Sequence, residues 1–326
     1  MPSVAVVGAS GCVGEAMLEL LRESALGEEP PRLFGSARSA GRAVPWKEGF
    51  ELEIEELNES ADLSDIDVAL FAASGDVARK WAPWFIDEGV AVVDNSSAFR
   101  LEPGVPLVIP EINGELVSSA PAIIANPNCS TILLLLAIAP LRALGPYRVI
   151  ADTYQAVSGA GRGGLEALER ERARGDFQEG NPFPFPIEGN LFPLIGEVGE
   201  DGMTSEERKM LDESRKILDW PDLRVHTTCV RVPVERCHSL AVTLVYPKEI
   251  SRADAAALLQ SAKGTTYISD PSRPPLPGPL SRTHSVHVGR LRRTGERVLQ
   301  LWVVGDQILK GAALNAMQIA ELWRSK

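Results

Sequence analysis

A strand, a glycine-rich turn and a helix follow one another at the start of this chain. The segment VAVVGASGCVGEAMLELL joins a β-branched apolar run to an amphipathic helical pattern, and Gly8, Gly11 and Gly14 lie between them at the spacing GxxGxxG. Glycine permits a tight turn and lets another group approach the backbone closely. The segment therefore predicts the first βα turn of an α/β domain.

The same alternation continues through the first third of the chain. The strand-like runs RLFGSA, DVALFAA and VAVVDNSS follow in order, with a helical pattern at residues 77–87. Short apolar runs that alternate with helical patterns are typical of βαβ units. We therefore expect an N-terminal Rossmann-like domain with a doubly wound, mostly parallel sheet.

The pattern changes after an apolar helix that begins near Ser130. A second, α+β domain with a largely antiparallel sheet is predicted over residues 130–304. A last helical pattern, residues 308–323, is expected to return to the first domain, which would then comprise residues 1–129 and 305–326. The strand-like runs of the second domain are residues 148–157, 230–234, 240–246, 285–291 and 298–304, with the turn signal Thr294-Gly295-Glu296 between the last two.

Composition excludes several classes of function. The net charge is -11, which disfavours non-specific binding to nucleic acid or to an anionic membrane, because both need clustered basic residues. The chain has no signal-peptide pattern and no apolar run long enough to span a membrane, so we expect a cytoplasmic protein. The four cysteines form no CxxC pair and no zinc spacing, so free thiols and no metal site are expected.

The glycine-rich turn predicts a dinucleotide site. Backbone N–H groups at the start of the following helix can face a pyrophosphate. After the second strand, an NAD-specific protein usually carries an acidic residue, but this chain has FGSARSAGR, with Ser36, Arg38 and Ser39. These side chains suit a 2′-phosphate and favour NADP over NAD. The alternative is a solvated polar loop.

The stretch NPNCST places Cys129 directly before the apolar run ILLLLAIA. Because Asn126-Pro127-Asn128 does not continue a helix comfortably, Cys129 is predicted at a helix N-terminus, where the helix dipole lowers the pKa of a thiol. A thiolate near a nicotinamide suggests aldehyde chemistry through a thioester. The alternative is a buried, inert cysteine.

A histidine is needed for the proton steps, and His238 is the best candidate of four. It follows the run VRVPVERC between two predicted strands, seven residues after Arg231. A loop there can bring both residues to one cleft. His284 and His287 lie three apart in a predicted strand, so they do not share a face as a metal pair.

Together these motifs resemble the aspartate-β-semialdehyde dehydrogenase family. The matching pieces run through nearly the whole chain: GASGCVG, SARSAG, DNSSAFR, NPNCST, YQAVSGAGRGG, DGMTSEERKMLDESRKIL, VRVPVERCHS and KGAALNAMQIAEL. The resemblance implies reduction of L-aspartyl 4-phosphate with NADPH to L-aspartate 4-semialdehyde and phosphate. It places this step in lysine, diaminopimelate, methionine and threonine biosynthesis, and it implies a homodimer or homotetramer whose second domain is catalytic and dimerising.

The resemblance also assigns residues. It makes Cys129 the nucleophile and His238 the general acid/base, with Gln155 orienting the acyl intermediate. Arg231 would bind the substrate carboxylate and Glu206 its amino group. Three further residues are assigned to the substrate: Asn128, and Arg100 and Lys209, which would bind its phosphate. The cofactor assignments are Gly8, Ser10, Gly11, Cys12, Val13 and Gly14 for the pyrophosphate; Ser36, Arg38 and Ser39 for the 2′-phosphate; Ser74 and Gly75 near the adenosine; and Ser158, Gly159 and Asn315 near the nicotinamide.

Three positions depart from the family pattern, and three other readings stay open. Cys237 replaces the usual glycine before the histidine, Gly305-Asp306-Gln307 replaces Ser-Asp-Asn, and Glu188-Gly189 replaces apolar residues. One alternative is an N-acetyl-γ-glutamyl-phosphate reductase, whose substrate has an acylated nitrogen. The others are a non-phosphorylating aldehyde dehydrogenase and an inactive binding protein, which should have lost Cys129, His238 or Arg231.

Overall fold

The computed structural model describes residues 3–326 except 48, 147, 176 and 178–181. It consists of two compact units. One comprises Met1–Pro127 with Ala312–Lys326, and the other comprises Asn128–Gly311.

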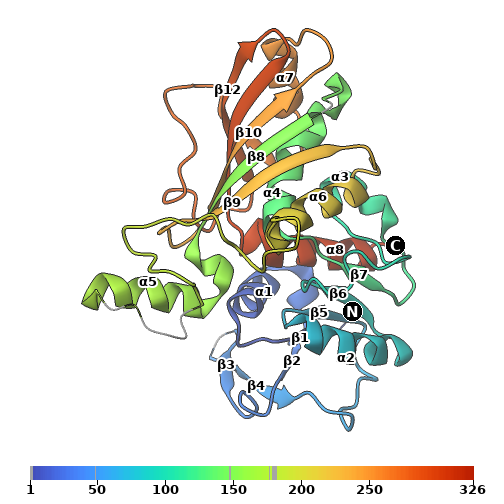
Figure 1. The fold of residues 1–326 in the computed structure, drawn as a ribbon. Helices are drawn as coiled ribbons and strands as arrows, with labels where there is room; N and C mark the ends of the chain where they lie inside the picture. The colour runs from blue at the N-terminus through green and yellow to red at the C-terminus, as the bar shows by residue number, and fades with distance from the viewer. Residues whose placement is uncertain (1–2, 48, 147, 176, 178–181) are drawn as a thin grey trace. The chain divides into compact units, whose positions relative to one another are not determined.

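The first unit is built on a seven-stranded sheet in the order β3-β4-β2-β1-β5-β6-β7 (Figure 1). The pairs from β4 to β7 are parallel, and β3 joins antiparallel to β4. The predicted Rossmann-like domain is thus confirmed. Its elements are β1 (Val4–Val7), α1 (Cys12–Glu23), a 3₁₀ turn (Ala25–Gly27), β2 (Arg32–Gly35), β3 (Ala43–Pro45), β4 (Glu51–Glu56), β5 (Val68–Phe71), α2 (Gly75–Asp87), β6 (Ala91–Asp94), α3 (Pro110–Asn113), a second 3₁₀ turn (Gly114–Leu116), β7 (Ile123–Ala125) and α8 (Leu314–Arg324).

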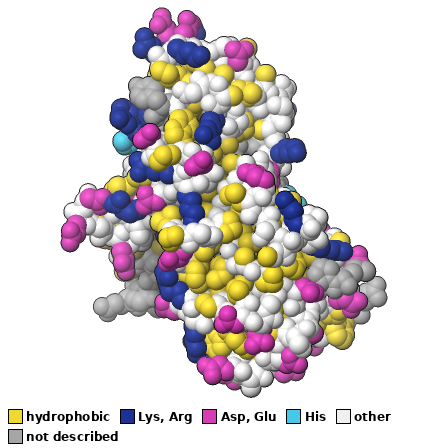
Figure 2. Space-filling model, turned by 90° about the vertical axis from the view of Figure 1, so that its right-hand side faces the viewer, with side chains coloured by type: hydrophobic (Ala, Val, Ile, Leu, Met, Phe, Trp, Pro, Cys, Tyr) yellow, Lys and Arg dark blue, Asp and Glu magenta, His cyan; other side chains and the backbone are white. Residues whose placement is uncertain are grey.

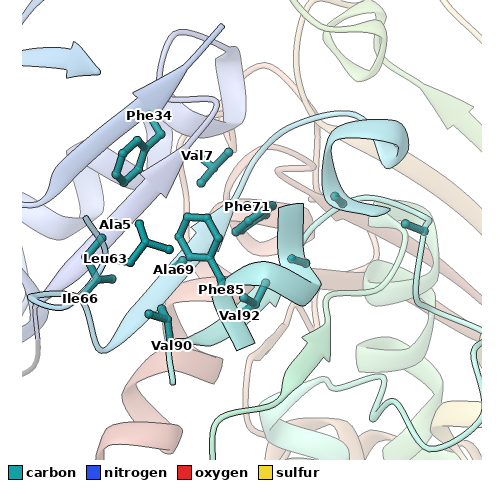
Figure 3. Packing of buried hydrophobic residues seen from close by; sticks show 13 residues of the cluster. Ala5, Val7, Phe34, Leu63, Ile66, Ala69, Phe71, Phe85, Val90 and Val92 are labelled. Carbon is teal, nitrogen blue, oxygen red and sulfur yellow. The ribbon is translucent and has the colours of Figure 1, made fainter. Parts of the chain in front are cut away.

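Helices cover both faces of this sheet. Strands β1, β5 and β6 are buried along their whole length, as a parallel sheet between two helical layers requires. On one face, Phe71 of β5 packs edge to face on Phe85 of α2, with ring centroids 5.2 Å apart, and Phe34 joins the same cluster (Figure 3). Helices α1 and α8 pack together against the sheet. The C-terminal helix α8 thus lies in the same unit as α1.

The second unit contains a six-stranded sheet in the order β11-β12-β13-β10-β8-β9. The four central strands pair antiparallel, and the edge strands β9 and β11 pair parallel to their neighbours. The largely antiparallel sheet is therefore confirmed. The elements are α4 (Cys129–Ile138), a 3₁₀ helix (Ala139–Leu144), β8 (Arg148–Gln155), η4 (Val157–Ala160), α5 (Arg162–Arg174), α6 (Ser205–Ile217), β9 (Arg224–Arg231), β10 (His238–Val245), α7 (Arg252–Gln260), β11 (Thr265–Tyr267), β12 (Val286–Gly295), β13 (Val298–Gly305) and a π-helix (Leu309–Ala313).

One predicted strand was wrong. The run at residues 230–234 is not a strand; β9 instead ends at Arg231 and begins at Arg224. Buried side chains recur in the segment RVHTTCVR at Val225, Cys229 and Arg231, and the segment pairs with β8 over its full length. Pro233, which lacks an N–H to donate to a ladder, lies beyond its end.

The two faces of the second sheet differ. Helices α4 and α7 pack on one face, and α6 packs on β9 (Figure 1). Helix α4 is buried from Ser130 to Ile138, so its uniformly apolar sequence is explained by burial on all sides. The opposite face presents Tyr154 and Trp302, whose ring centroids are 5.5 Å apart. The loop at Pro275 contacts this face, because Trp302 Nε1 donates to Pro275 O at 3.1 Å.

The distribution of charged side chains on the surface is consistent with the net negative charge of the chain. On the face shown in Figure 2, Lys and Arg side chains are interspersed with Asp and Glu and do not form one basic patch. In the part of the chain that the structure describes, no helix combines the length and the apolar character needed to cross a membrane.

Candidate active site

The nucleophile candidate lies where the sequence predicts it. Cys129 is the first residue of α4, and Asn128 is the N-cap, whose Oδ1 accepts hydrogen bonds from Ser130 N at 2.9 Å and Thr131 N at 3.1 Å. The helix starts here because Pro127 and the Asn128 cap interrupt the preceding backbone. The Cys129 thiol is half-buried, and the positive end of the helix dipole favours its thiolate.

A buried carboxylate adjoins this cap. Glu206, 6% exposed, accepts hydrogen bonds from Asn128 Nδ2 at 2.9 Å and from Gln155 Nε2 at 3.3 Å. Burial pushes the pKa of Glu206 upward, but Lys209, Asn128 and Gln155 outweigh burial and hold that pKa below its usual value. Glu206 is therefore ionised at neutral pH, in a buried position and not as half of an exposed ion pair on the helix surface.

Gln155 links the end of β8 to the nucleophile helix. Its Nε2 donates to Ser130 Oγ at 2.6 Å as well as to Glu206. Lys209 Nζ lies 3.3 Å from Glu206 Oε2, one turn along α6. The capping box of Thr204 and Glu207, which starts α6, is present as a reciprocal pair of hydrogen bonds. The structure thus brings Asn128, Gln155, Glu206 and Lys209 together around the start of α4.

Arg231 and His238 form the second cluster of the site. Arg231, at the end of β9, is 5% exposed, and its Nη1 donates to Ala156 O at 2.6 Å. His238, at the start of β10, is fully buried, and its Nδ1 accepts from Ala156 N at 3.0 Å. Burial and the Arg231 cation hold the pKa of His238 well below its usual value. Among the described residues, His238 Nε2 has no hydrogen-bond partner.

These clusters belong to one electrostatic environment. Burial lowers the pKa of the Arg231 guanidinium, and the negative charges of Glu206 and of an ionised Cys129 oppose that effect. An arginine that interacts with the nucleophile, the carboxylate and the histidine can bind an anion between them.

Gly159 provides a test of how closely this cluster is packed. A Cβ at Gly159 would lie 2.9 Å from Arg231 Nη1 and 3.1 Å from His238 Cε1. Gly159→Ala is therefore expected to displace both side chains and to lower kcat/KM about 10-fold to 100-fold. Gly163→Ala, where a Cβ meets only Pro182 Cγ at 3.8 Å, is the matched control. Wild-type kcat/KM in Gly159→Ala would contradict the packing argument.

Two of the three departures from the family pattern lie next to His238: Cys237 precedes it, and Gly305 pairs with it between β13 and β10. Cys237 adopts a φ of 72°, a left-handed conformation that is strained for a residue with a Cβ. Its N–H donates to Gln307 Oε1 at 2.9 Å, which helps to hold it. Burial raises the pKa of the Cys237 thiol to about 12, so the thiol stays protonated at neutral pH and a redox-sensitive thiolate beside His238 is not expected.

The Gly305-Asp306-Gln307 segment is tied into the second unit. Gln307 Nε2 donates to Ser158 Oγ at 2.5 Å. Asp306 accepts from Arg236 Nε at 2.6 Å. A Cβ at Gly305 would lie 2.5 Å from Leu133 Cδ2, so Leu133 accounts for the glycine at this position. Gln307 was not among the residues predicted for the site, although its departure from the usual asparagine was a signal that could have indicated it.

The dinucleotide residues lie at the carboxyl ends of the parallel strands of the first unit. Gly8 adopts a φ of 87°, and a Cβ there would lie 2.6 Å from Ala72 O. A Cβ at Gly14 would lie 2.3 Å from Gly8 O. Only glycine fits at these two positions, so the loop keeps its backbone open in front of α1. This cradle fits a pyrophosphate at a helix N-terminus. Ser10, Gly11, Cys12 and Val13 continue from the loop into the first turn of α1.

The other cofactor candidates follow two neighbouring strands. Ser36 and Arg38 are exposed after β2, and Ser39 is buried with its Oγ donating to Ser36 O. Ser74 caps α2, in which Gly75 is the first residue. Ligands of open α/β sheets bind outside the carboxyl ends of the strands, which is where these residues lie.

Arg100 and Asn315 are also in the first unit. Arg100, 8% exposed, donates from Nε to Asn126 O at 2.9 Å and from Nη2 to Asn95 O at 2.8 Å. Asn315 is fully buried, and its Nδ2 donates to Asn126 Oδ1 at 2.7 Å and to Val108 O at 3.0 Å. Both side chains therefore fix the loop around Asn126. In the residues that the structure describes, no group of three or more His, Cys, Asp or Glu side chains is arranged to hold a metal ion.

A Rossmann-like unit with a glycine cradle and a second unit with a cysteine at a helix N-terminus define a nucleotide-dependent oxidoreductase that works through a thiol. Two family models match the chain: "Semialdehyde dehydrogenase, NAD binding domain" over residues 3–120 and "Semialdehyde dehydrogenase, dimerisation domain" over residues 138–310. The chain belongs to the semialdehyde dehydrogenase family.

Curated relatives and solved structures agree. The aspartate-semialdehyde dehydrogenase of Aquifex aeolicus is 43% identical over 98% of this chain and 97% of its own length. The aspartate-semialdehyde dehydrogenase of Bacillus subtilis is 41% identical over 98% of this chain and 96% of its own length. The crystal structure of aspartate semialdehyde dehydrogenase II from Vibrio cholerae superposes with a TM-score of 0.94 at 38% identity, covering 99% of this chain and 98% of that one. The same protein complexed with ASA gives a TM-score of 0.95 at 38% identity, covering 100% and 99%.

Proposed function

We propose that this chain is an NADP-dependent acyl-phosphate reductase that converts L-aspartyl 4-phosphate to L-aspartate 4-semialdehyde and phosphate, reversibly. The observation that carries the proposal is the buried, ionised Glu206, linked through Asn128 to the helix that begins at Cys129. Full-length relatives named aspartate-semialdehyde dehydrogenase support it. The step belongs to lysine, diaminopimelate, methionine and threonine biosynthesis.

The residues of the second unit have complementary roles in this proposal. The Cys129 thiolate attacks the acyl carbon, the bond to the phosphate oxygen breaks, and a thioester forms. NADPH, when bound, supplies the hydride. The resulting thiohemiacetal releases the aldehyde as its carbon–sulfur bond breaks and the thiolate re-forms. His238, whose Nε2 is the ring nitrogen without a described partner, handles the proton steps, and Gln155 orients the acyl group.

Charge explains the choice of substrate. Arg231 binds the α-carboxylate as a bidentate partner that lysine could not replace, and anionic Glu206 binds the free α-ammonium group. An acylated nitrogen is neutral and would leave the Glu206 charge unmatched, which disfavours an N-acetyl-γ-glutamyl phosphate. Arg100 and Lys209 are proposed to bind the phosphate, and Asn128 borders the substrate.

The residues proposed for the pyrophosphate, the adenosine and the 2′-phosphate belong to the first unit, whereas Ser158 and Gly159 belong to the second. Gly8 to Gly14 bind the pyrophosphate, Ser74 and Gly75 lie near the adenosine, and Ser158, Gly159 and Asn315 lie near the nicotinamide. The sequence after β2 has no acidic residue for ribose hydroxyls, so NADP is favoured. A solved relative from Candida albicans, "with NADP", shares the fold. The 2′-phosphate residues are Ser36, Arg38 and Ser39.

The test is oxidation of aspartate semialdehyde, followed by nicotinamide absorbance. Turnover with NADP that requires phosphate is the expected result, with NAD run beside it to measure preference. Turnover without phosphate would instead support a non-phosphorylating aldehyde dehydrogenase. No turnover in a protein that still binds NADP would favour the acetylglutamyl substrate or a non-catalytic role, and assay of N-acetylglutamate semialdehyde separates these two.

We further propose a cytoplasmic location, because a catalytic thiol must stay reduced. We also propose a homodimer formed through the face of the second sheet that carries Tyr154 and Trp302, called the open face below. The family model for residues 138–310 is a dimerisation domain. Tyr154 is 38% exposed and Trp302 is half-buried, and their ring centroids lie 5.5 Å apart. Aromatic residues are enriched in the cores of interfaces.

Trp302→Glu tests this interface. A carboxylate on the open face would be buried against its own copy, so the variant is expected to sediment as a monomer. Phe50→Glu, at a side chain that is 55% exposed in the first unit, is the control and should sediment as wild type. A dimeric Trp302→Glu protein would move the interface elsewhere.

A further inference from the structure

Helix α6 carries three buried carboxylates, and the proposed mechanism uses only one. Glu206 faces the substrate, Glu207 caps α6, and Glu213 is 1% exposed. A fully buried carboxylate is unfavourable unless strong hydrogen bonds compensate its lost hydration. Glu213 Oε2 accepts a hydrogen bond from Asn128 N at 2.7 Å. One partner of the Glu213 carboxylate is therefore the backbone directly before the nucleophile.

Asn128 is held by α6 at two points. Its backbone N–H donates to Glu213, and its side-chain Nδ2 donates to Glu206 Oε1 at 2.9 Å. Glu206 and Glu213 are seven residues apart, which is two turns and the same face of a helix. The Asn128 side chain meanwhile caps α4. The residue preceding Cys129 thus cannot rotate without breaking a charge-assisted hydrogen bond.

We infer that Glu213 is a positioning residue for the nucleophile: its carboxylate fixes the Asn128 peptide, and through it the place of Cys129 at the start of α4. The inference deepens the proposed function and rests on it where turnover is concerned. As an anion near the helix N-terminus, the carboxylate is expected to disfavour ionisation of the Cys129 thiol while it holds the thiol in place. The other charged groups near Cys129 include Glu206 on α6 and Arg231 on β9, which itself interacts with His238.

Glu213→Gln is the test, because glutamine keeps the shape and can accept the same N–H without the charge. We expect kcat to fall about tenfold with the KM for aspartate semialdehyde near wild type. The pH midpoint of Cys129 alkylation by iodoacetamide, measured on the Cys129 peptide by mass spectrometry, is expected to fall by about 0.5 to 1 pH unit, because an anion near the thiolate is lost. Alkylation needs no substrate, so a wrong substrate assignment would not affect this result.

Glu207→Gln is the matched control. Glu207 is also a buried carboxylate of α6, but it accepts from Thr204 N at 2.8 Å and Cys229 N at 3.2 Å. The Glu207→Gln substitution should lower the melting temperature, while kcat and the pH midpoint of Cys129 alkylation stay at wild-type values. Equal changes in both variants would overturn the inference, as would a folded Glu213→Gln protein with unchanged kcat and midpoint.

A second variant, Glu213→Asp, tests the same inference if Glu213→Gln folds poorly. Glu213→Asp keeps the charge but is one methylene shorter, so the contact with Asn128 N is lost. It is expected to lower kcat while the alkylation midpoint stays nearer to wild type than in Glu213→Gln. Wild-type kcat in Glu213→Asp would also overturn the inference.

Discussion

Replacing Cys129 by alanine is expected to lower kcat by about 10⁴-fold or more, because no other group can form the thioester. Cys129 is the first residue of α4 and half-buried, and its side chain borders Gly311, where a Cβ would lie 3.0 Å from Cys129 Cβ. The measurement is the initial rate of aspartate semialdehyde oxidation, with cofactor affinity measured separately by fluorescence titration.

Cofactor affinity in Cys129→Ala should be nearly unchanged. The buried Cys229→Ala protein is the control for loss of a thiol, since burial raises the pKa of Cys229 far above its usual value and makes it a poor nucleophile. An active Cys129→Ala enzyme would refute the covalent route.

His238→Ala is expected to lower kcat about 10²-fold to 10⁴-fold, the usual contribution of a positioned proton-transfer group. His238 is fully buried, with Nδ1 bonded to Ala156 N. His287 on β12 is half-buried and is the control: His287→Ala should retain wild-type kcat. Normal rates in His238→Ala would remove His238 from the mechanism.

The pH dependence of stability follows from the same burial. The pKa of His238 is lowered in the folded state, so the unfolded chain binds a proton at higher pH than the folded chain. The free energy of unfolding that neutral His238 contributes is complete above pH about 6.5 and falls as the pH drops below that value. Urea titrations of wild type and His238→Gln between pH 5 and 8 check this, with the variant expected to have the flatter profile.

Much of the fold could be predicted from local sequence patterns. The βαβ order, the hairpin of β12 and β13 and the start of α4 at Cys129 all follow from alternation, turn residues and capping within a few positions. These signals work because backbone geometry and burial act on neighbouring residues. The same logic failed for β9, where the three valines of VRVPV at residues 230–234 gave a stronger strand pattern than RVHTTCVR, the segment that forms the strand.

Site chemistry that depends on residues far apart in the sequence could be predicted only in part. Glu206 could be assigned by resemblance, but its ionisation in a buried position depends on Lys209, Asn128 and Gln155 together. Glu213 and Gln307 were not predicted, because their partners Asn128, Ser158 and Cys237 lie many residues away. A glutamate on an amphipathic helix has the same local pattern whether it faces solvent or a buried N–H.

The sequence by itself determined the two kinds of domain, the glycine cradle and the position of Cys129 at a helix N-terminus, since each depends on residues adjacent in the chain. Only the tertiary structure decided that Glu206 and Glu213 both hold Asn128, that Gly159 lies against Arg231 and His238, and that Cys237 is an unreactive thiol. Burial removes water from these groups, so their charge and hydrogen bonding depend on which side chains the fold brings next to them.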